Sequence, residues 1–135
     1  ESVDWEFPAS VMDIVMMGRY RKNNLMRRLS KADRDIAAEA LEKVNMLEFS
    51  NRQISQLSGG QQQLVGIARA LIGKPKLILA DEPTGNLNSK QSTEIMELFS
   101  QLNQEGVTII QATHSEKNAG YGSRIANLLD GRIVE

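Results

Sequence analysis

Two adjacent carboxylates, Asp81 and Glu82, follow the short apolar run at residues 77–80. A carboxylate at the carboxyl end of a buried parallel strand lies in the crevice where open α/β sheets bind ligands. Asp81 could hold Mg²⁺ there, directly or through water, because hard cations prefer oxygen ligands. Glu82 could accept a proton from an attacking water molecule. The alternative interpretation of the pair is two solvated acids at the end of a strand.

His114 is the only histidine of the chain, and it follows a second apolar run, VTIIQAT, at residues 107–113. Neighbouring parallel strands end at the same edge of a sheet, so we expect His114 to lie near Glu82. It could there donate a hydrogen bond to a terminal phosphate or orient Glu82. The alternative is a histidine that is structural or merely exposed.

A third polar cluster begins the segment LSGGQQQLVGIARAL, residues 57–71. Glycines at the start of a helix let a ligand approach the backbone closely, because no Cβ stands in the way. The first helical turn has unpaired N–H groups and the positive end of the helix dipole, and Ser58 adds a hydroxyl donor. These features predict an anion site. For the short string SGG alone, a serine N-cap followed by flexible glycines is the simpler interpretation.

The elements that must position these residues follow from hydrophobic spacing and from helix-capping residues. Ser30 and Asp33 have the spacing of a capping box. Helices are predicted after Ser10, over 30–44, from Gln61 to a C-cap at Gly73, and over 89–103.

Two continuous apolar runs, KLILAD at 76–81 and VTIIQAT at 107–113, predict strands that are buried on both faces. With a helix between them, they predict a right-handed parallel βαβ unit. Asp130-Gly131 separates two further apolar runs and predicts a two-residue hairpin. We therefore expect an α/β fold with a helical front half.

Composition narrows the class of protein. The chain has 135 residues, enough for one domain with a real core, and 16 basic residues balance 17 acidic ones. This balance favours neither nucleic acid nor a membrane as partner. The absence of cysteine excludes disulfides and thiolate metal sites, and no stretch has the length and hydropathy of a membrane span.

One segment is locally basic. Between residues 19 and 31 the chain has six basic residues and no acidic one: Arg19, Arg21, Lys22, Arg27, Arg28 and Lys31. The segment is either a solvated loop or a contact with an acidic partner surface or lipid headgroups.

The order LSGGQ, LILADEP, GNLN and THS resembles the nucleotide-binding domain of ATP-binding cassette (ABC) proteins, from about Gln56 to the end of the chain. The resemblance implies a P-loop NTPase-type parallel sheet fragment preceded by an ABC helical subdomain. It implies a boundary between 1–56, the helical subdomain, and 57–135. The second part would contain the signature helix, the Walker B strand, the D-loop, the switch histidine and a C-terminal hairpin.

The resemblance also implies roles for single residues. Asp81 would be the Mg²⁺-associated aspartate, Glu82 the general base and His114 the switch histidine. The remaining positions are the signature residues, which would bind ATP held on the opposite subunit, and the D-loop: Ser58, Gly59, Gly60 and Gln61, then Gly85, Asn86, Leu87 and Asn88. The glutamines after the signature glycines would line the subunit interface or face solvent.

The partners implied are a second nucleotide-binding domain and transmembrane transporter subunits, with ATP and Mg²⁺ as cofactors and no nucleic acid. Such a subunit would lie on the cytoplasmic face of the membrane without inserting into it. Two other functions stay open: a soluble ABC ATPase in DNA repair or translation, and a non-catalytic dimerisation fragment.

Two departures from the family pattern matter. No G-x-x-x-x-G-K-[ST] motif occurs, since the only Gly-Lys pair, Gly73-Lys74, is followed by proline. The D-loop also ends in Asn88, where the family usually has aspartate. We therefore expect a truncated piece of a cassette that is inactive alone. The front half resembles metal-importing subfamilies, and the back half resembles lipoprotein-release and macrolide-export types.

Overall fold

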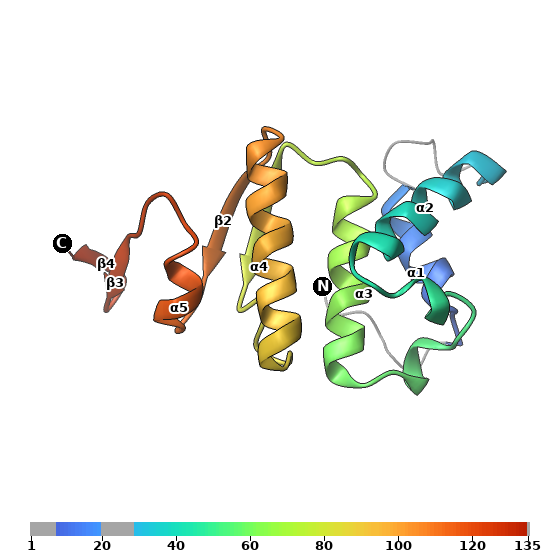
Figure 1. Ribbon diagram of the computed structural model, residues 1–135, viewed down its shortest axis with the longest axis horizontal. Helices are drawn as coiled ribbons and strands as arrows, with labels where there is room; N and C mark the ends of the chain where they lie inside the picture. Colours follow the sequence, from blue (N-terminus) through green and yellow to red (C-terminus); the bar gives the residue numbers. More distant parts are fainter. Residues whose placement is uncertain (1–7, 20–28, 135) are drawn as a thin grey trace.

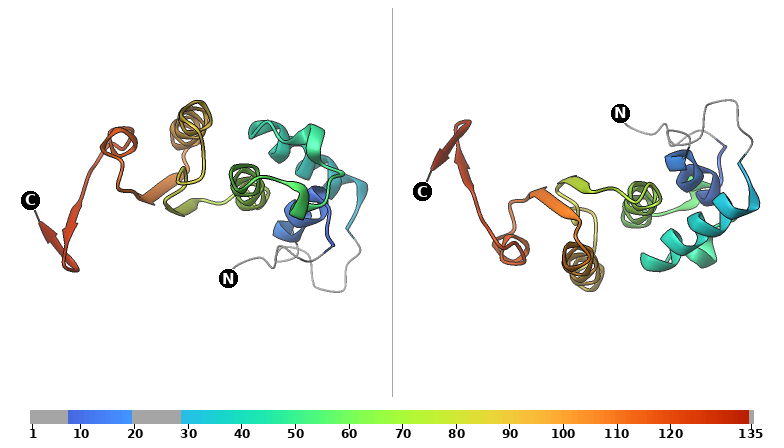
Figure 2. Two further views of the ribbon diagram at one scale, coloured as in Figure 1. Left: turned by 90° about the horizontal axis from the view of Figure 1, so that it is seen from below. Right: turned by 90° about the horizontal axis from the view of Figure 1, so that it is seen from above.

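The computed structural model describes residues 8–19 and 29–134 (Figure 1). Its helices are α1 (Val11–Met16), α2 (Lys31–Lys43), α3 (Gly59–Leu71), α4 (Ser89–Gln104) and α5 (Glu116–Ala119), with 3₁₀ turns at Met17–Arg19, Leu47–Phe49 and Ile54–Gln56. Its strands are β1 (Leu77–Asp81), β2 (Thr108–Ala112), β3 (Asn127–Leu129) and β4 (Arg132–Val134). Helices α1 to α3 form one end of the molecule, β1, α4 and β2 the middle, and the β3–β4 hairpin projects from the other end (Figure 2).

The short helix α1 lies at the centre of the helical group. Five of its six side chains are buried, and α1 packs against both α2 and α3. A helix that is apolar on nearly all sides must be covered on all sides. Ser10 caps it as predicted, in a capping box with Asp13. The preceding backbone pairs with the loop that leads to α3, through the N–H of Ile54 and the carbonyl of Ala9 at 3.1 Å.

The predicted capping box of α2 is confirmed. The Ser30 hydroxyl accepts from the Asp33 N–H at 3.3 Å, and the Ser30 N–H donates to Asp33 Oδ2 at 2.8 Å. The Arg19 guanidinium adds a hydrogen bond from Nε to Asp33 Oδ1 at 3.0 Å. Arg19, the first residue of the basic segment, therefore stabilises the helical group. The other basic residues of that segment lie outside the described residues, except Lys31, which begins α2.

Asp33 makes the stability of the chain depend on pH. The backbone N–H of Ser30, then the Ser30 hydroxyl and the Arg19 guanidinium, lower the pKa of Asp33 from 3.8 to about 2. A folded-state pKa below the unfolded one stabilises the protein above the unfolded pKa, and this contribution is lost as the pH falls. We expect the difference in unfolding free energy between wild type and Asp33→Asn, from urea titrations, to shrink from about pH 4 to about pH 2. A difference independent of pH would contradict this.

Helix α3 differs from the prediction at both ends. It begins at Gly59, so both glycines belong to its first turn and Ser58 is the N-cap. It ends at Leu71 with Ile72 as C-cap, and the left-handed residue of the turn that follows is Lys74 (φ 47°), not Gly73. Pro75 prevents the helix from continuing through Lys74, since the ring of a proline keeps the residue before it out of the right-handed helical region.

The βαβ unit is confirmed. Strands β1 and β2 pair in parallel, with Leu77 opposite Thr108 and Asp81 opposite Ala112. Helix α4 covers one face of the pair with a buried stripe of Ile95, Met96, Phe99 and Leu102 (Figure 2). The predicted hairpin is also confirmed, because Asp130 and Gly131 both have positive φ between β3 and β4. The fold class is α/β.

The prediction that both faces of the strands are buried is wrong for the structure described. Leu79 and Ile110 lie opposite each other in the register, and these residues are 72% and 58% exposed. A continuous apolar run indicates that a strand needs apolar cover on both faces. The helices or strands that provide this cover are separate elements, which the run itself does not specify. In the described residues one such layer, α4, is present.

Candidate functional site

The site is built around Glu82, the first residue after β1. Its backbone N–H donates to the carbonyl of Ala112 at 2.9 Å, which extends the parallel pairing by one residue. Its carboxylate accepts from the backbone N–H of His114 at 2.7 Å, and Oε2 lies 3.4 Å from the Thr113 hydroxyl. The loop that follows β2 therefore holds the Glu82 carboxylate on both oxygens.

The expectation that His114 and Glu82 lie together is confirmed, with one difference. The imidazole Nε2 lies 3.7 Å from Glu82 Oε1, beyond hydrogen-bond distance, and the side chain of His114 is fully exposed. The backbone of His114, and not its ring, orients the carboxylate. The ring is left accessible to a ligand at the carboxyl end of the two strands.

Glu82 has a strained backbone. Its φ is +43°, in the left-handed region, and Pro83 follows it. A non-glycine residue pays about 1–3 kcal/mol for such a conformation, which persists only when the surroundings fix it. The Glu82 carbonyl accepts from the Gly85 N–H at 3.0 Å and from Gln63 Nε2 at 3.0 Å. Strain of this kind gathers at functional sites, which agrees with a role for Glu82.

A buried polar contact that the sequence did not suggest joins the turn after Glu82 to α5. Asn118 Nδ2 donates to the Thr84 hydroxyl at 2.7 Å, and both side chains are buried. Gln111 of β2 donates to the carbonyl of Asn118 at 2.9 Å. A buried polar side chain needs a hydrogen-bond partner. The sequence could not show this pair, because Thr84 and Asn118 are 34 residues apart in the chain.

The predicted anion site lies at the first turn of α3. Ser58 and Gln61 form a capping box, in which Gln61 N–H donates to the Ser58 hydroxyl at 3.2 Å. A Cβ added at Gly59 would meet no atom within 4 Å. A Cβ at Gly60 would lie 2.7 Å from the carbonyl oxygen of Asn86. Gly59 is thus the open position, while Gly60 lets the 85–88 loop of the same chain pack against the helix.

The glutamines behind these glycines are bound within the chain, in contrast to the expectation that they line an interface or face solvent. Gln62 Nε2 donates to the carbonyls of Ile54 and Leu57, at 3.2 and 3.4 Å. Gln63 reaches the carbonyl of Glu82. The repeat QQQ therefore fixes the loop before the helix and connects the helix to the end of β1.

The 85–88 loop ends at a helix cap. The Asn88 side chain accepts from the Gln91 N–H at 2.9 Å, and the Gln91 side chain accepts from the Asn88 N–H at 3.3 Å. Asparagine and aspartate are equally good N-caps. Asn88 in place of the usual aspartate is therefore compatible with the local fold.

Asp81 is the residue that could face a metal ion. Its side chain is exposed, and Ala112 is its partner in the register. In the described part of the chain, no group of three or more His, Cys, Asp or Glu side chains is arranged to hold a metal ion. Mg²⁺ typically takes one or two carboxylates together with substrate phosphates and water. A single exposed carboxylate fits that mode of binding.

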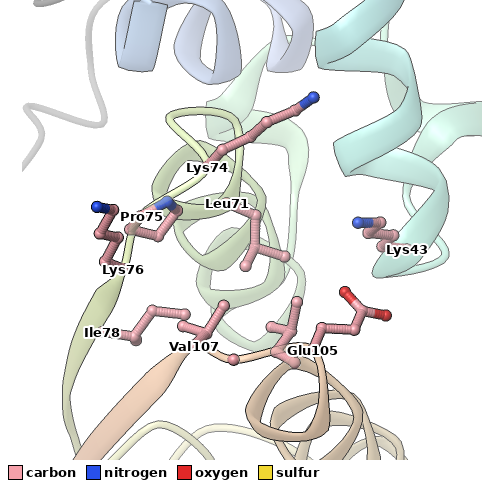
Figure 3. Close-up of a pocket in the computed structure, with 10 residues that line it drawn as sticks. Lys43, Leu71, Lys74, Pro75, Lys76, Ile78, Glu105 and Val107 are labelled. Carbon is pink, nitrogen blue, oxygen red and sulfur yellow. The ribbon is translucent and has the colours of Figure 1, made fainter.

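A pocket of about 360 Å³ lies at the opposite end of the strands. It is lined by the ends of α2, α3 and α4 and the starts of β1 and β2, and its basic residues are Lys43, Lys74 and Lys76 (Figure 3). Their ammonium groups point in different directions and do not converge (Figure 3). Asp81 and Glu82 are at the other ends of the strands, so this pocket is separate from the candidate site.

Comparison with known proteins identifies relatives. A family model described as ABC transporter matches residues 7–85. The chain is 44% identical over 118 residues to the manganese transport system ATP-binding protein MntB of Bacillus subtilis (strain 168), covering 87% of this chain and 47% of MntB. It is 48% identical over 98 residues to the macrolide export ATP-binding/permease protein MacB of Chlorobium luteolum, covering 73% of this chain and 15% of MacB.

Solved structures agree. The dimeric structure of MJ0796, a bacterial ABC transporter cassette, matches with a TM-score of 0.88 and 37% identity, over 99% of this chain and 59% of that one. A putative metal-chelate type ABC transporter in an inward-facing conformation matches with a TM-score of 0.78 and 34% identity, over 90% and 48%. The chain spans about half the length of the manganese-transport relatives it matches. In the described residues, no helix is long and apolar enough to cross a membrane.

Proposed function

This chain belongs to the ABC transporter family, and from this premise we propose that it is part of an ATP-hydrolysing subunit that powers transport of a substrate across a membrane. The observation that carries the proposal is the Glu82 carboxylate, held by the His114 N–H at 2.7 Å on a strained backbone next to Asp81. A general base must be fixed in direction and stay within reach of solvent, and Glu82 is both fixed and partly exposed.

Each residue at the strand ends then has a distinct task. Glu82 orients and deprotonates the attacking water, and the exposed ring of His114 hydrogen bonds the terminal phosphate. Asp81 would hold Mg²⁺, which would supply charge neutralisation of the phosphates when bound. Thr113 and the backbone of His114 keep the carboxylate aimed, and the turn at Pro83 and Gly85 keeps it in place.

The first turn of α3 serves a second molecule. Ser58, Gly59, Gly60 and Gln61 would bind ATP held on the opposite subunit, with free N–H groups and the helix dipole as the attraction. The loop at Gly85, Asn86, Leu87 and Asn88 would lie at the same interface. The dimeric form of the MJ0796 cassette supports a second nucleotide-binding domain as partner.

The helices before α3 would face the membrane subunits. We assign residues 1–56 to the helical subdomain and 57–135 to the part with the catalytic motifs. The names of the manganese-transport relatives and of the inward-facing transporter support transmembrane subunits as partners. A subunit of this kind lies on the cytoplasmic face of the membrane. The 135 residues alone contain no G-x-x-x-x-G-K-[ST] motif, so on their own we propose that they hydrolyse no ATP.

The exposed start of α3 gives a test of the proposal. In the complete protein, with Mg²⁺ and a non-hydrolysable ATP analogue, sedimentation velocity should show a dimer for wild type. Gly59→Glu should weaken this dimer by about tenfold or more, because a carboxylate beside a phosphate in a partly desolvated interface costs about 1.4 kcal/mol or more. A glutamate in the first turn interacts favourably with the helix dipole, so we expect the variant to keep its fold.

The matched control is Gly66→Glu. Gly66 belongs to the same helix, and a Cβ there also meets no atom within 4 Å, but it lies two turns from the N-terminus. This variant should dimerise like wild type. A wild-type protein that stays monomeric with the analogue would overturn the proposed function, and equal dimerisation of all three would remove Gly59 from the site.

A further inference from the structure

We propose that Gln63 is a positioning residue, which fixes the Glu82 peptide in the conformation that presents the carboxylate to the His114 N–H. The inference rests on the proposed function, in which Glu82 is the base. Gln63 belongs to α3 and not to the strands or the turn around Glu82. It therefore ties the helix that begins with the signature residues to the proposed base of the same chain.

The contact is direct. Gln63 Nε2 lies 3.0 Å from the carbonyl oxygen of Glu82, and the Gln63 side chain is half-buried. The same carbonyl accepts from Gly85 N–H at 3.0 Å, while the Glu82 N–H is bound to Ala112. Among the described residues, Gln63 is the one side chain that is hydrogen bonded to the backbone of Glu82, since the other two bonds are to backbone groups.

Glu82 needs such a restraint because its backbone is unfavourable on two counts. Its φ of +43° is rare for a side chain with a Cβ, and the proline after it favours an extended conformation instead. Without the bond from Gln63, Glu82 can relax toward the extended region by rotation about its N–Cα bond, which moves its Cβ and its carbonyl together. The Cα–Cβ bond turns with it, and the carboxylate leaves the position where His114 N–H and Thr113 hold it.

The amide is suited to this task. A glutamine supplies an uncharged N–H donor at the end of a chain that reaches from α3 to the strand end, without a buried charge. The neighbouring residue of the repeat, Gln62, donates instead to the carbonyls of Ile54 and Leu57, in the segment before α3. The specific assignment is thus to Gln63 and its contact with Glu82.

The test is steady-state ATP hydrolysis by the complete protein. Gln63→Met keeps the length and removes the donor, and it should lower kcat about tenfold, equal to about 1.4 kcal/mol, with KM for ATP within about twofold. Gln63→Asn keeps the amide but shortens its reach, and it should show the same loss. In single-turnover measurements on Glu82→Gln protein, adding Gln63→Met should have no further effect, since the residue acts through Glu82.

The matched control is Asn103→Leu. Asn103 Nδ2 also donates to a backbone carbonyl, that of Val107, at 3.0 Å, but at the far end of the strands. This variant should keep kcat within about twofold. If Glu82→Gln abolishes hydrolysis while both Gln63 variants keep wild-type kcat, the positioning role is overturned and the proposed function stands. If Glu82→Gln itself leaves turnover unchanged, the proposed function fails.

Discussion

Glu82→Gln in the complete protein should lower the rate of ATP hydrolysis by about two to four orders of magnitude while ATP binding stays close to wild type. The substitution preserves shape, because a glutamine oxygen can still accept from the His114 N–H that lies 2.7 Å from Glu82 Oε1. What is lost is the capacity to take a proton. Phosphate release measures the rate, and fluorescent nucleotide titration measures the binding.

The comparison variant for this experiment is Glu97→Gln, which removes an equivalent charge from the exposed side of α4. It should hydrolyse ATP at the wild-type rate. Hydrolysis by Glu82→Gln at the rate of wild type would remove Glu82 from the role of base. A parallel loss of ATP binding would assign it instead to holding the nucleotide.

Gly18→Ala should lower the free energy of unfolding by about 2–3 kcal/mol, a substantial part of the net stability of a domain. A Cβ at Gly18 would meet the side chain of Ile72 and lie 2.5 Å from the carbonyl oxygen of Arg69. Arg69 lies in the last turn of α3, and Ile72 is the buried C-cap of that helix. The backbone must move to make room for the methyl group. This movement separates the 3₁₀ turn after α1 from α3. Urea denaturation followed by circular dichroism measures the change.

Gly66→Ala is the same substitution in open space. A Cβ there meets no atom within 4 Å, and alanine is favoured over glycine inside a helix by about 0.5–1 kcal/mol. This variant should therefore be slightly more stable than wild type. If Gly18→Ala lowers the free energy of unfolding and Gly66→Ala raises it, the loss at Gly18 comes from packing against α3. A Gly18→Ala protein as stable as wild type would show that the contact yields without cost.

Local elements of the fold could be predicted from the sequence because their causes lie within a few residues. Ser10 and Ser30 cap helices with partners three residues on, through Asp13 and Asp33. Asp130-Gly131 adopts the positive φ values of a tight hairpin. The two apolar runs and the helix between them predicted the parallel pair of strands. Because parallel strands end at the same edge, this pairing also brings Glu82 and the 113–114 loop together.

The contacts that decide what the local pieces do join residues far apart in the chain. Spacing could not show that Gln63 reaches Glu82, 19 residues on, or that Gly60 is needed for the approach of Asn86. It also predicted cover on both faces of the strands, where Leu79 and Ile110 are exposed. Helical and strand periods fix which side chains share a face, because they are properties of a single element. Which element lies opposite that face depends on packing between elements, and only the tertiary structure determines it.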